Sequence, residues 1–187
     1  MWKFAFAGFR HGHVNALYKL AKDNPRVEIA AAWEADEKAR RQAEENLGVK
    51  FTHDDYNDMI SSEDIDVVVV GDYYGIRGSH AIAALKAGKH VYADKPLCTS
   101  IDELDEIERL AMEKNLKVGL MLDMRYNKVV RPVRNFIMEG KLGEIHAIFF
   151  GGQHPLLYGT RPGWYFEEGK HGGTINDIAI HGIDLVE

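Results

Sequence analysis

Short apolar runs alternate with amphipathic stretches through residues 1–122. The clearest run is Asp66–Val70, in which four consecutive valines suit a strand that is buried on both faces, as in a parallel sheet. Alternation of strands and helices is typical of a doubly wound α/β fold with helices on both faces of a parallel sheet. The runs predict strands over residues 3–7, 27–33, 49–51, 66–70, 89–93 and 117–122.

Helical spacing fills the intervals between these strands. Val14 and Leu17 lie three residues apart on one helical face, and Gly48 follows a stretch rich in helix-forming residues as a stop signal. Ser100 and Glu103 have the spacing of a capping box, which predicts a helix that runs to about residue 114. The other expected helices span residues 14–21, 36–47, 54–61 and 79–87.

The pattern changes near Leu122, where we place a domain boundary. We expect a first domain over residues 1–122 and, over residues 123–187, the incomplete beginning of a second α+β domain. The second part has too little chain to close a core of its own. Its pattern predicts a helix over 127–139, a strand over 145–151, a long loop over 153–173 rich in glycine, proline and aromatic residues, and a helix over 174–186.

Charge, apolar content and cysteine use narrow the partners. The 187 residues carry a net charge of −6, which argues against a nucleic-acid partner. No apolar run approaches the ~18 residues that a membrane span needs. The single cysteine, Cys98, allows no internal disulfide and suits a reducing compartment, so we expect a cytoplasmic protein.

The first strand, turn, helix and second strand form a dinucleotide-binding pattern, typical of the Rossmann fold. Gly8 and Gly12 lie in the turn, where glycines let the backbone approach a pyrophosphate at the helix N-terminus. Glu34 ends the second strand, where its carboxylate would accept from a ribose 2′-hydroxyl and repel a 2′-phosphate. This pattern predicts NAD as the cofactor, with NADP possible.

The turn is irregular, because Arg10 and His13 occupy positions where the strict motif has glycine. Gly8 and Gly12 could therefore be turn residues only. Arg10, His11 and His13 would add positive charge near a pyrophosphate and soften the preference against NADP. His11 and His13 lack the accompanying cysteines or His/Glu spacing of a zinc site, so we expect cofactor-loop or structural roles and no metal.

Two further groups are candidates for chemistry. Lys95 follows a strand, at the edge where open α/β sheets bind ligands, and Pro96 restricts it toward extended geometry. Asp177 and His181 are four residues apart on a predicted helix, so a carboxylate could orient an imidazole. The alternatives are a surface lysine in a loop and an ion pair on a helix surface.

Several short motifs occur in one order along the chain: Gly88-Lys89-His90-Val91, Asp94-Lys95-Pro96, residues 140–145 (GKLGEI), and Gly172-Gly173-Thr174 followed by Asp177 and His181. Together they resemble the Gfo/Idh/MocA family of nicotinamide-dependent oxidoreductases, which includes glucose–fructose oxidoreductase and inositol dehydrogenase. The resemblance covers the whole chain. Members of this family are usually longer, with an open-faced mixed sheet that completes the second domain and often forms an oligomer interface.

The resemblance implies that Lys95, Asp177 and His181 are catalytic. It also implies cofactor contacts from Asp94, which stands where most members have glutamate, and from His80, which matches a recurrent histidine. The residues implied or predicted to bind the cofactor are Gly8, Arg10, His11, Gly12, Glu34, Asp72, Tyr73, His80, Asp94 and Lys95. Residues 71–74 (GDYY) replace the Thr-Pro-Asn common in the family, a departure that leaves the contacts of Asp72 and Tyr73 open. Residues 125–127 match the segment that enters the second domain.

The resulting hypothesis is a dehydrogenase that transfers hydride between NAD and a secondary alcohol of a sugar, inositol or related polyol. His181 or Lys95 would exchange the hydroxyl proton, and the full-length protein would be a homo-oligomer. Trp164, Tyr165 and Tyr126 would offer stacking faces for a sugar ring, unless they are core or interface aromatics. The alternatives are a non-catalytic dinucleotide-binding sensor and an NAD-dependent glycoside hydrolase of the same family.

Overall fold

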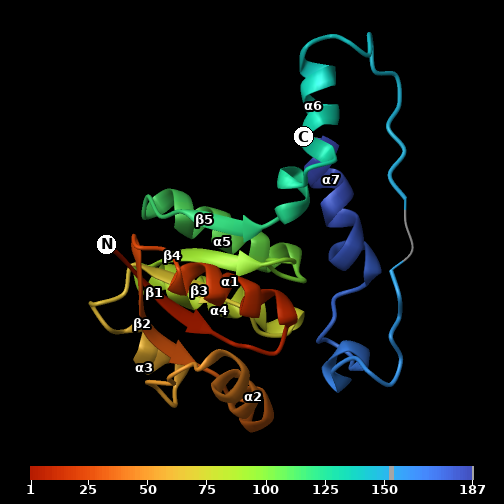
Figure 1. Ribbon diagram of the computed structural model, residues 1–187. Coiled ribbons are helices and arrows are strands. Elements are labelled where there is room, and N and C mark those ends of the chain that lie inside the picture. The colour runs from red at the N-terminus through yellow and green to blue at the C-terminus, as the bar shows by residue number, and fades with distance from the viewer. Residues whose placement is uncertain (152–153, 187) are drawn as a thin grey trace. The chain divides into compact units, whose positions relative to one another are not determined.

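A computed structural model describes residues 1–151 and 154–186 of the chain. Its centre is a five-stranded sheet with the order β2-β1-β3-β4-β5, and all neighbouring strands pair in parallel (Figure 1). The predicted doubly wound parallel sheet is therefore confirmed. The strands are β1 Trp2–Ala7, β2 Val27–Trp33, β3 Val67–Val70, β4 His90–Asp94 and β5 Val118–Met121.

Helices connect the strands and begin and end largely where the sequence signals lie. Asp36 and Asp55 accept hydrogen bonds from backbone amides as N-caps, and Gly48 ends a helix in the left-handed conformation at φ 65°. The helices of this part are α1 Gly12–Lys22, α2 Glu37–Leu47, α3 Tyr56–Ile60, α4 Tyr74–Lys86 and α5 Ile101–Glu113.

The two faces of the sheet are buried under different helices. In β3, Val68 and Val70 pack in a cluster with residues of α3, α4 and α5, whereas Val69 packs in a cluster with residues of α1 and α2. Burying a valine side chain contributes about 1.5–3 kcal/mol relative to an exposed one. The run of valines is thus explained by burial on both faces of a central strand.

Three predictions of where a strand or helix lies fail in detail. Residues 49–51 form no strand: Val49 is buried, but the pairing with β2 is limited to Thr52, whose amide donates to the Ala32 carbonyl at 3.1 Å. Helix α4 begins at Tyr74, five residues before the predicted start. Residues 145–151 also form no strand, and none of the described residues pairs with them. An apolar run becomes a strand only where a neighbour accepts its backbone hydrogen bonds.

The predicted capping box at Ser100 is wrong, although α5 begins there as expected. Ser100 has N-cap geometry but makes no side-chain cap hydrogen bond. Glu103 instead lies against α4, where its carboxylate occupies the space beside Gly78 that a side chain would need.

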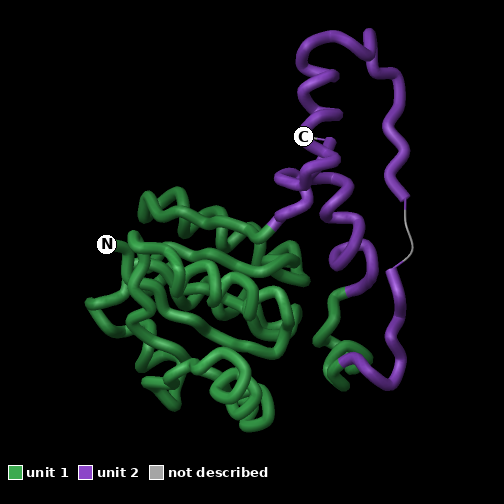
Figure 2. Tube along the Cα trace, viewed as in Figure 1, with its two compact units in different colours: residues 1–121, 162–172 green, residues 122–161, 173–187 purple. Residues whose placement is uncertain are grey.

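The chain divides into two compact units (Figure 2). Unit 1 contains Met1–Met121 and also Pro162–Gly172, which includes the 3-10 helix η2 Gly163–Phe166. Unit 2 contains the rest of the chain: η1 Asp123–Tyr126, α6 Val130–Met138, the π-helix η3 Ile175–Ala179 and α7 Ile180–Val186. Within unit 2, the guanidinium of Arg125 pairs with the carboxylate of Asp184. Across residues 1–151 and 154–186, every helix is too short or too polar to cross a membrane.

Candidate functional site

The register of the sheet brings the ends of four strands to one level. Ala7 lies opposite both Trp33 and Val70, and Val70 lies opposite Ala93. The residues one step beyond this level, at positions 8, 34, 71 and 94, therefore lie along one carboxyl edge. In open α/β sheets this edge is where ligands bind.

Gly8 is required by the close approach of two chain segments at this edge. Its φ is 87°, and a Cβ at this position would lie 2.6 Å from the amide nitrogen of Asp72. A larger residue would push the segment after β1 away from the segment after β3. Gly8 therefore has the geometric role that the first glycine of a dinucleotide-binding turn performs.

The N-terminus of α1 fits a bound pyrophosphate. His11 is the N-cap residue, but its side chain makes no hydrogen bond to the first-turn amides, and a Cβ on Gly12 would meet no atom of the described residues within 4 Å. Amides at a helix N-terminus carry partial positive charge and bind phosphate. The open space at Gly12 and the uncapped amides are suited to the pyrophosphate of a dinucleotide.

A buried ion cluster lies at the ends of β2 and β3. The Glu34 carboxylate accepts from the Phe9 amide at 2.5 Å, the Asp36 amide at 2.8 Å and Arg10 Nε at 3.1 Å. Arg10 Nε also lies 3.2 Å from Asp72 Oδ1. Burial raises the pKa of Asp72 to about 6, although Arg10 opposes the shift. Arg10 is thus held between two acids at the place where the sequence pattern predicts the adenosine ribose.

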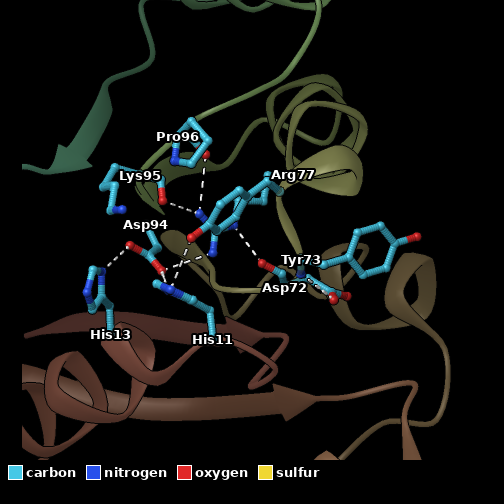
Figure 3. A network of polar contacts seen from close by, with 9 residues as sticks. His11, His13, Asp72, Tyr73, Arg77, Asp94, Lys95 and Pro96 are labelled. Atoms are coloured by element: carbon cyan, nitrogen blue, oxygen red, sulfur yellow. Dashed lines mark hydrogen bonds and ion pairs between the residues drawn. The ribbon is translucent and has the colours of Figure 1, made fainter. Parts of the chain in front are cut away.

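The carboxylate of Asp94 is surrounded by three nitrogen groups (Figure 3). His11 Nδ1 lies 2.5 Å from Oδ2, His13 Nδ1 lies 3.0 Å from Oδ1, and a terminal nitrogen of Arg77 lies 2.9 Å from Oδ2. Burial alone would raise the pKa of Asp94, but the hydrogen bonds from the histidines and the charge of Arg77 lower it. Asp94 therefore remains ionised and organises its neighbours.

His11, His13 and Asp94 also form a possible ligand set for a divalent ion, since their ligand atoms lie within 4.8 Å of one another. The sequence spacing alone did not reveal Asp94 as their neighbour. The guanidinium of Arg77 contacts the same carboxylate at 2.9 Å and opposes a cation there by charge repulsion. The expectation of no metal remains a prediction.

Lys95 is only 5% exposed, which excludes the alternative of a surface lysine in a loop. Its ammonium nitrogen lies 5.8 Å from the centre of the Tyr74 ring, within the range of a cation–π contact. The Lys95–Pro96 peptide bond is cis. Its low exposure and its contact with Tyr74 show that the lysine is enclosed at the carboxyl end of β4 rather than free in solvent.

An aromatic segment from late in the chain packs over this edge within unit 1. The Trp164 ring lies 5.1 Å from the Tyr74 ring and 6.2 Å from the His11 ring, and His171 lies 5.3 Å from Tyr74. The Gly75 amide donates to the carbonyl of Lys170 at 2.9 Å. Residues 162–172 therefore lie beside the predicted cofactor turn, which their sequence position did not indicate.

Two further predicted cofactor-binding residues, Tyr73 and His80, differ in the groups that surround them. Tyr73 lies under two cations, with Arg10 at 5.1 Å and Lys170 at 5.3 Å from its ring centre. His80 lies farther along α4, packed against the rings of Trp33 and Tyr56. Burial lowers the pKa of His80 to about 4, so it is neutral near pH 7.

The second pair of predicted catalytic residues lies in unit 2. Asp177 is 2% exposed and belongs to η3, while His181 follows in α7. The burial of Asp177 excludes the alternative of an ion pair on a helix surface. A π-helical turn changes the helical phase between them, a feature that is frequent at functional sites. The convergence of Lys95 with Asp177 and His181 remains a prediction.

The sequence did not identify Arg77 or Tyr74 as members of the site. Both belong to α4, and the predicted start of that helix lay beyond them. A signal was present, because Tyr74, Arg77 and Ala81 follow helical spacing and share a buried face. A charged residue in such a position indicates a buried ionic partner.

Comparison with known proteins identifies both parts of the chain. Residues 3–122 match the model of an oxidoreductase family with an NAD-binding Rossmann fold, and residues 130–187 match the GFO/IDH/MocA C-terminal domain. Levoglucosan dehydrogenase of Pseudarthrobacter phenanthrenivorans is 28% identical over 157 residues, which are 81% of this chain and 40% of that protein. Inositol 2-dehydrogenase of Salmonella paratyphi B is 26% identical over 174 residues, which are 91% of this chain and 49% of that protein.

A solved structure supports the same relationship. Scyllo-inositol dehydrogenase from Lactobacillus casei, crystallised with NAD(H) and scyllo-inositol, superposes with a TM-score of 0.67 at 27% identity, covering 78% of this chain and 43% of that one. The chain thus spans less than half the length of these relatives. The two family models together match most of the sequence. The chain belongs to the Gfo/Idh/MocA family of NAD-binding oxidoreductases.

Proposed function

We propose that the full-length protein is an NAD-dependent dehydrogenase that acts on a secondary alcohol of a sugar, inositol or related polyol. The observation that carries the proposal is the buried Lys95 at the end of β4, on the same sheet edge as the turn that fits a pyrophosphate. Relatives named for levoglucosan and inositol support the substrate class.

The chain's own residues would hold the cofactor along this edge. The amides at the start of α1 and the backbone at Gly8 and Gly12 would bind the pyrophosphate, and Glu34 would accept from the adenosine ribose. Because the Glu34 side chain is fully buried, a neighbouring group would have to move before a ribose hydroxyl could reach it. When bound, NAD supplies the acceptor for the hydride.

Proton transfer would fall to residues of both units. His181 would take the proton of the substrate hydroxyl as general base, and Lys95 would donate a hydrogen bond to the same oxygen and stabilise its developing charge. Asp177 would orient the imidazole of His181. The reverse assignment, in which Lys95 exchanges the proton, uses the same three groups.

The test is a screen of the full-length protein with NAD against levoglucosan, myo-inositol, scyllo-inositol, D-xylose and related sugars, following the absorbance of reduced cofactor. We expect at least one polyol to support reduction, with less turnover when NADP replaces NAD. If the protein binds NAD but no member of the panel supports reduction of NAD, the proposal is contradicted and the alternative of a non-catalytic dinucleotide-binding sensor is favoured.

A further inference from the structure

Arg77 connects two segments that carry the candidate site, the loop after β3 and the turn after β4. It lies in the first turn of α4, and its side chain is fully buried. Its Nε donates to the carbonyl of Asp72 at 2.6 Å, which ties it to the loop after β3. Its terminal nitrogens donate to the turn after β4, as Figure 3 shows.

Three consecutive residues, the last of β4 and the first two of the turn after it, contact the same guanidinium. One terminal nitrogen donates to the carbonyl of Lys95 at 2.5 Å and to the carbonyl of Pro96 at 3.3 Å. The other donates to Asp94 Oδ2 at 2.9 Å. Lys95 is thus held at its own carbonyl and through both of its chain neighbours.

We propose that Arg77 is a positioning residue, which fixes the backbone of Lys95 relative to the β3 exit and so directs its ammonium toward the reacting oxygen. The effect on turnover rests on the proposed function; the effect on Lys95 itself does not. Only arginine presents donors in a rigid planar fork, so a lysine at position 77 could keep the charge opposite Asp94 but not the set of carbonyl bonds.

The Tyr74 ring adds a second constraint. The centre of the Arg77 guanidinium lies 4.6 Å from the centre of this ring, and the ammonium of Lys95 lies 5.8 Å from it. The ring therefore contacts both the positioning group and the group that it positions. Arg77 holds the backbone of Lys95, whereas Tyr74 only borders its side chain. We therefore expect Lys95 to lose its position when the Arg77 guanidinium is removed, even though Tyr74 is still present.

Lysine acetylation tests this placement without any assumption about catalysis. The full-length protein and its Arg77→Met and Arg77→Lys variants are treated with N-succinimidyl acetate, and modification of Lys95 and Lys89 is followed by peptide mass spectrometry. Lys89 is the internal control, because it is 8% exposed and its ammonium donates to the Ser62 carbonyl at 2.6 Å, away from the proposed fork. Arg40→Met is the matched variant, since Arg40 also lies over an aromatic ring and pairs with an aspartate.

We expect Arg77→Met to raise the rate of Lys95 acetylation by about tenfold or more, since several hydrogen bonds are lost, while Lys89 is unchanged. Arg77→Lys should also raise the rate of Lys95 acetylation, and Arg40→Met should leave the acetylation rates of Lys95 and Lys89 at the parent values. Unchanged Lys95 acetylation, or an equal rise at Lys89, would overturn the proposal. If Arg77→Met fails to fold, the ratio of the Lys95 acetylation rate to the Lys89 acetylation rate in Arg77→Lys decides the question.

Turnover provides the second readout. With NAD and the best polyol of the screen, kcat of Arg77→Lys should fall by about 10²-fold, the effect of misplacing a reacting group by about 1 Å, while the Kd for NAD stays within a few-fold of the parent. Wild-type kcat in this variant would overturn the role in the reaction. If no polyol is oxidised by the parent, the proposed function fails, and the acetylation ratio still decides the positioning of Lys95.

Discussion

Glu34 has two roles at the end of β2, one in the fold of the turn and one in the choice of cofactor. It accepts from the amides of Phe9 and Asp36, which stabilises the turn, and its negative charge would repel a 2′-phosphate. Glu34→Ala leaves these donors unpaired, at a cost of about 1–3 kcal/mol each, whereas Glu34→Gln removes the charge and keeps only one of the two accepting oxygens.

We therefore expect both variants to narrow the preference for NAD over NADP and to lower the thermal midpoint, because the amide NH2 in Glu34→Gln would face one of the donors. Arg10 would then be released to pair with a 2′-phosphate. The measurement is the ratio of Kd values for NADP and NAD in each variant and in the parent. Tighter binding of NADP by the unmodified protein would show that Arg10, rather than Glu34, decides the preference.

Asp72 and His80 make opposite contributions to the pH dependence of stability. The pKa of Asp72 is raised by burial from 3.8 to about 6, so its stabilising contribution is complete below about pH 4 and is lost as the pH rises through 6. The pKa of His80 is lowered by burial from 6.5 to about 4, so its contribution is complete above pH 6.5 and is lost as the pH falls through 4.

The opposite contributions of Asp72 and His80 partly cancel in the pH profile of the parent, but single variants should separate them. From pH 4 to pH 7, the thermal midpoint of Asp72→Asn should rise relative to the parent, and that of His80→Gln should fall relative to it. Parallel profiles of variant and parent across this range would show that the two groups do not titrate as their burial requires.

At the scale of single residues, the sequence predicted those positions that a local motif marks. Gly8 and Glu34 were proposed as site residues from the spacing of a turn and a strand end, and Lys95 from its place after a strand. Arg77 was missed because its partners lie 5, 17, 18 and 19 residues away on other segments. Its importance follows from tertiary contacts, which no local pattern contains.

Among the elements, residues 162–172 form the least expected part of unit 1. They were predicted as part of a loop of the second domain, yet they pack against the start of α4. Gly75 permits this contact, because a Cβ there would collide with the carbonyl oxygen of Gly169. The amide of Gly75 also donates to Lys170.

Gly75→Ala should therefore displace this segment and expose the bond after Lys170 to trypsin. Gly163→Ala is the matched control, since a Cβ at that position would lie no nearer than 3.8 Å, at the Glu167 carboxylate, to any other group in the part of the chain that the structure describes. We expect cleavage after Lys170 to be faster in Gly75→Ala than in Gly163→Ala, measured by peptide mass spectrometry. Equal rates in the two variants would show that the contact at Gly75 does not hold the segment.

The strands of the parallel sheet were predictable because each is an apolar run bounded by clear stop signals, and β3 is buried along its whole length. The failures at residues 49–51 and 145–151 have one cause: the local sequence is apolar, but strand formation also requires a partner. The early start of α4 has another cause. Tyr74 and Gly75 resemble loop residues, but the contacts of residues 162–172 hold them in the helix.

For the whole molecule, the proposed chemistry depends on both units. Lys95 belongs to unit 1, whereas Asp177 and His181 belong to unit 2. The central claim is that these three groups serve one reaction, although more than 80 residues separate Lys95 from Asp177. Neither unit would then be sufficient for activity, and only the full-length protein is a fair test.

The most direct measurement is kcat, together with the Kd for NAD, for Lys95→Ala and His181→Ala in the full-length protein. Lys128→Ala and His146→Ala are matched controls, because both side chains are exposed. The account predicts that Lys95→Ala and His181→Ala each lower kcat by about 10²–10⁴-fold, the range for loss of an acid–base group, with NAD affinity nearly intact and the controls unchanged. Near-normal turnover in either Lys95→Ala or His181→Ala would contradict it.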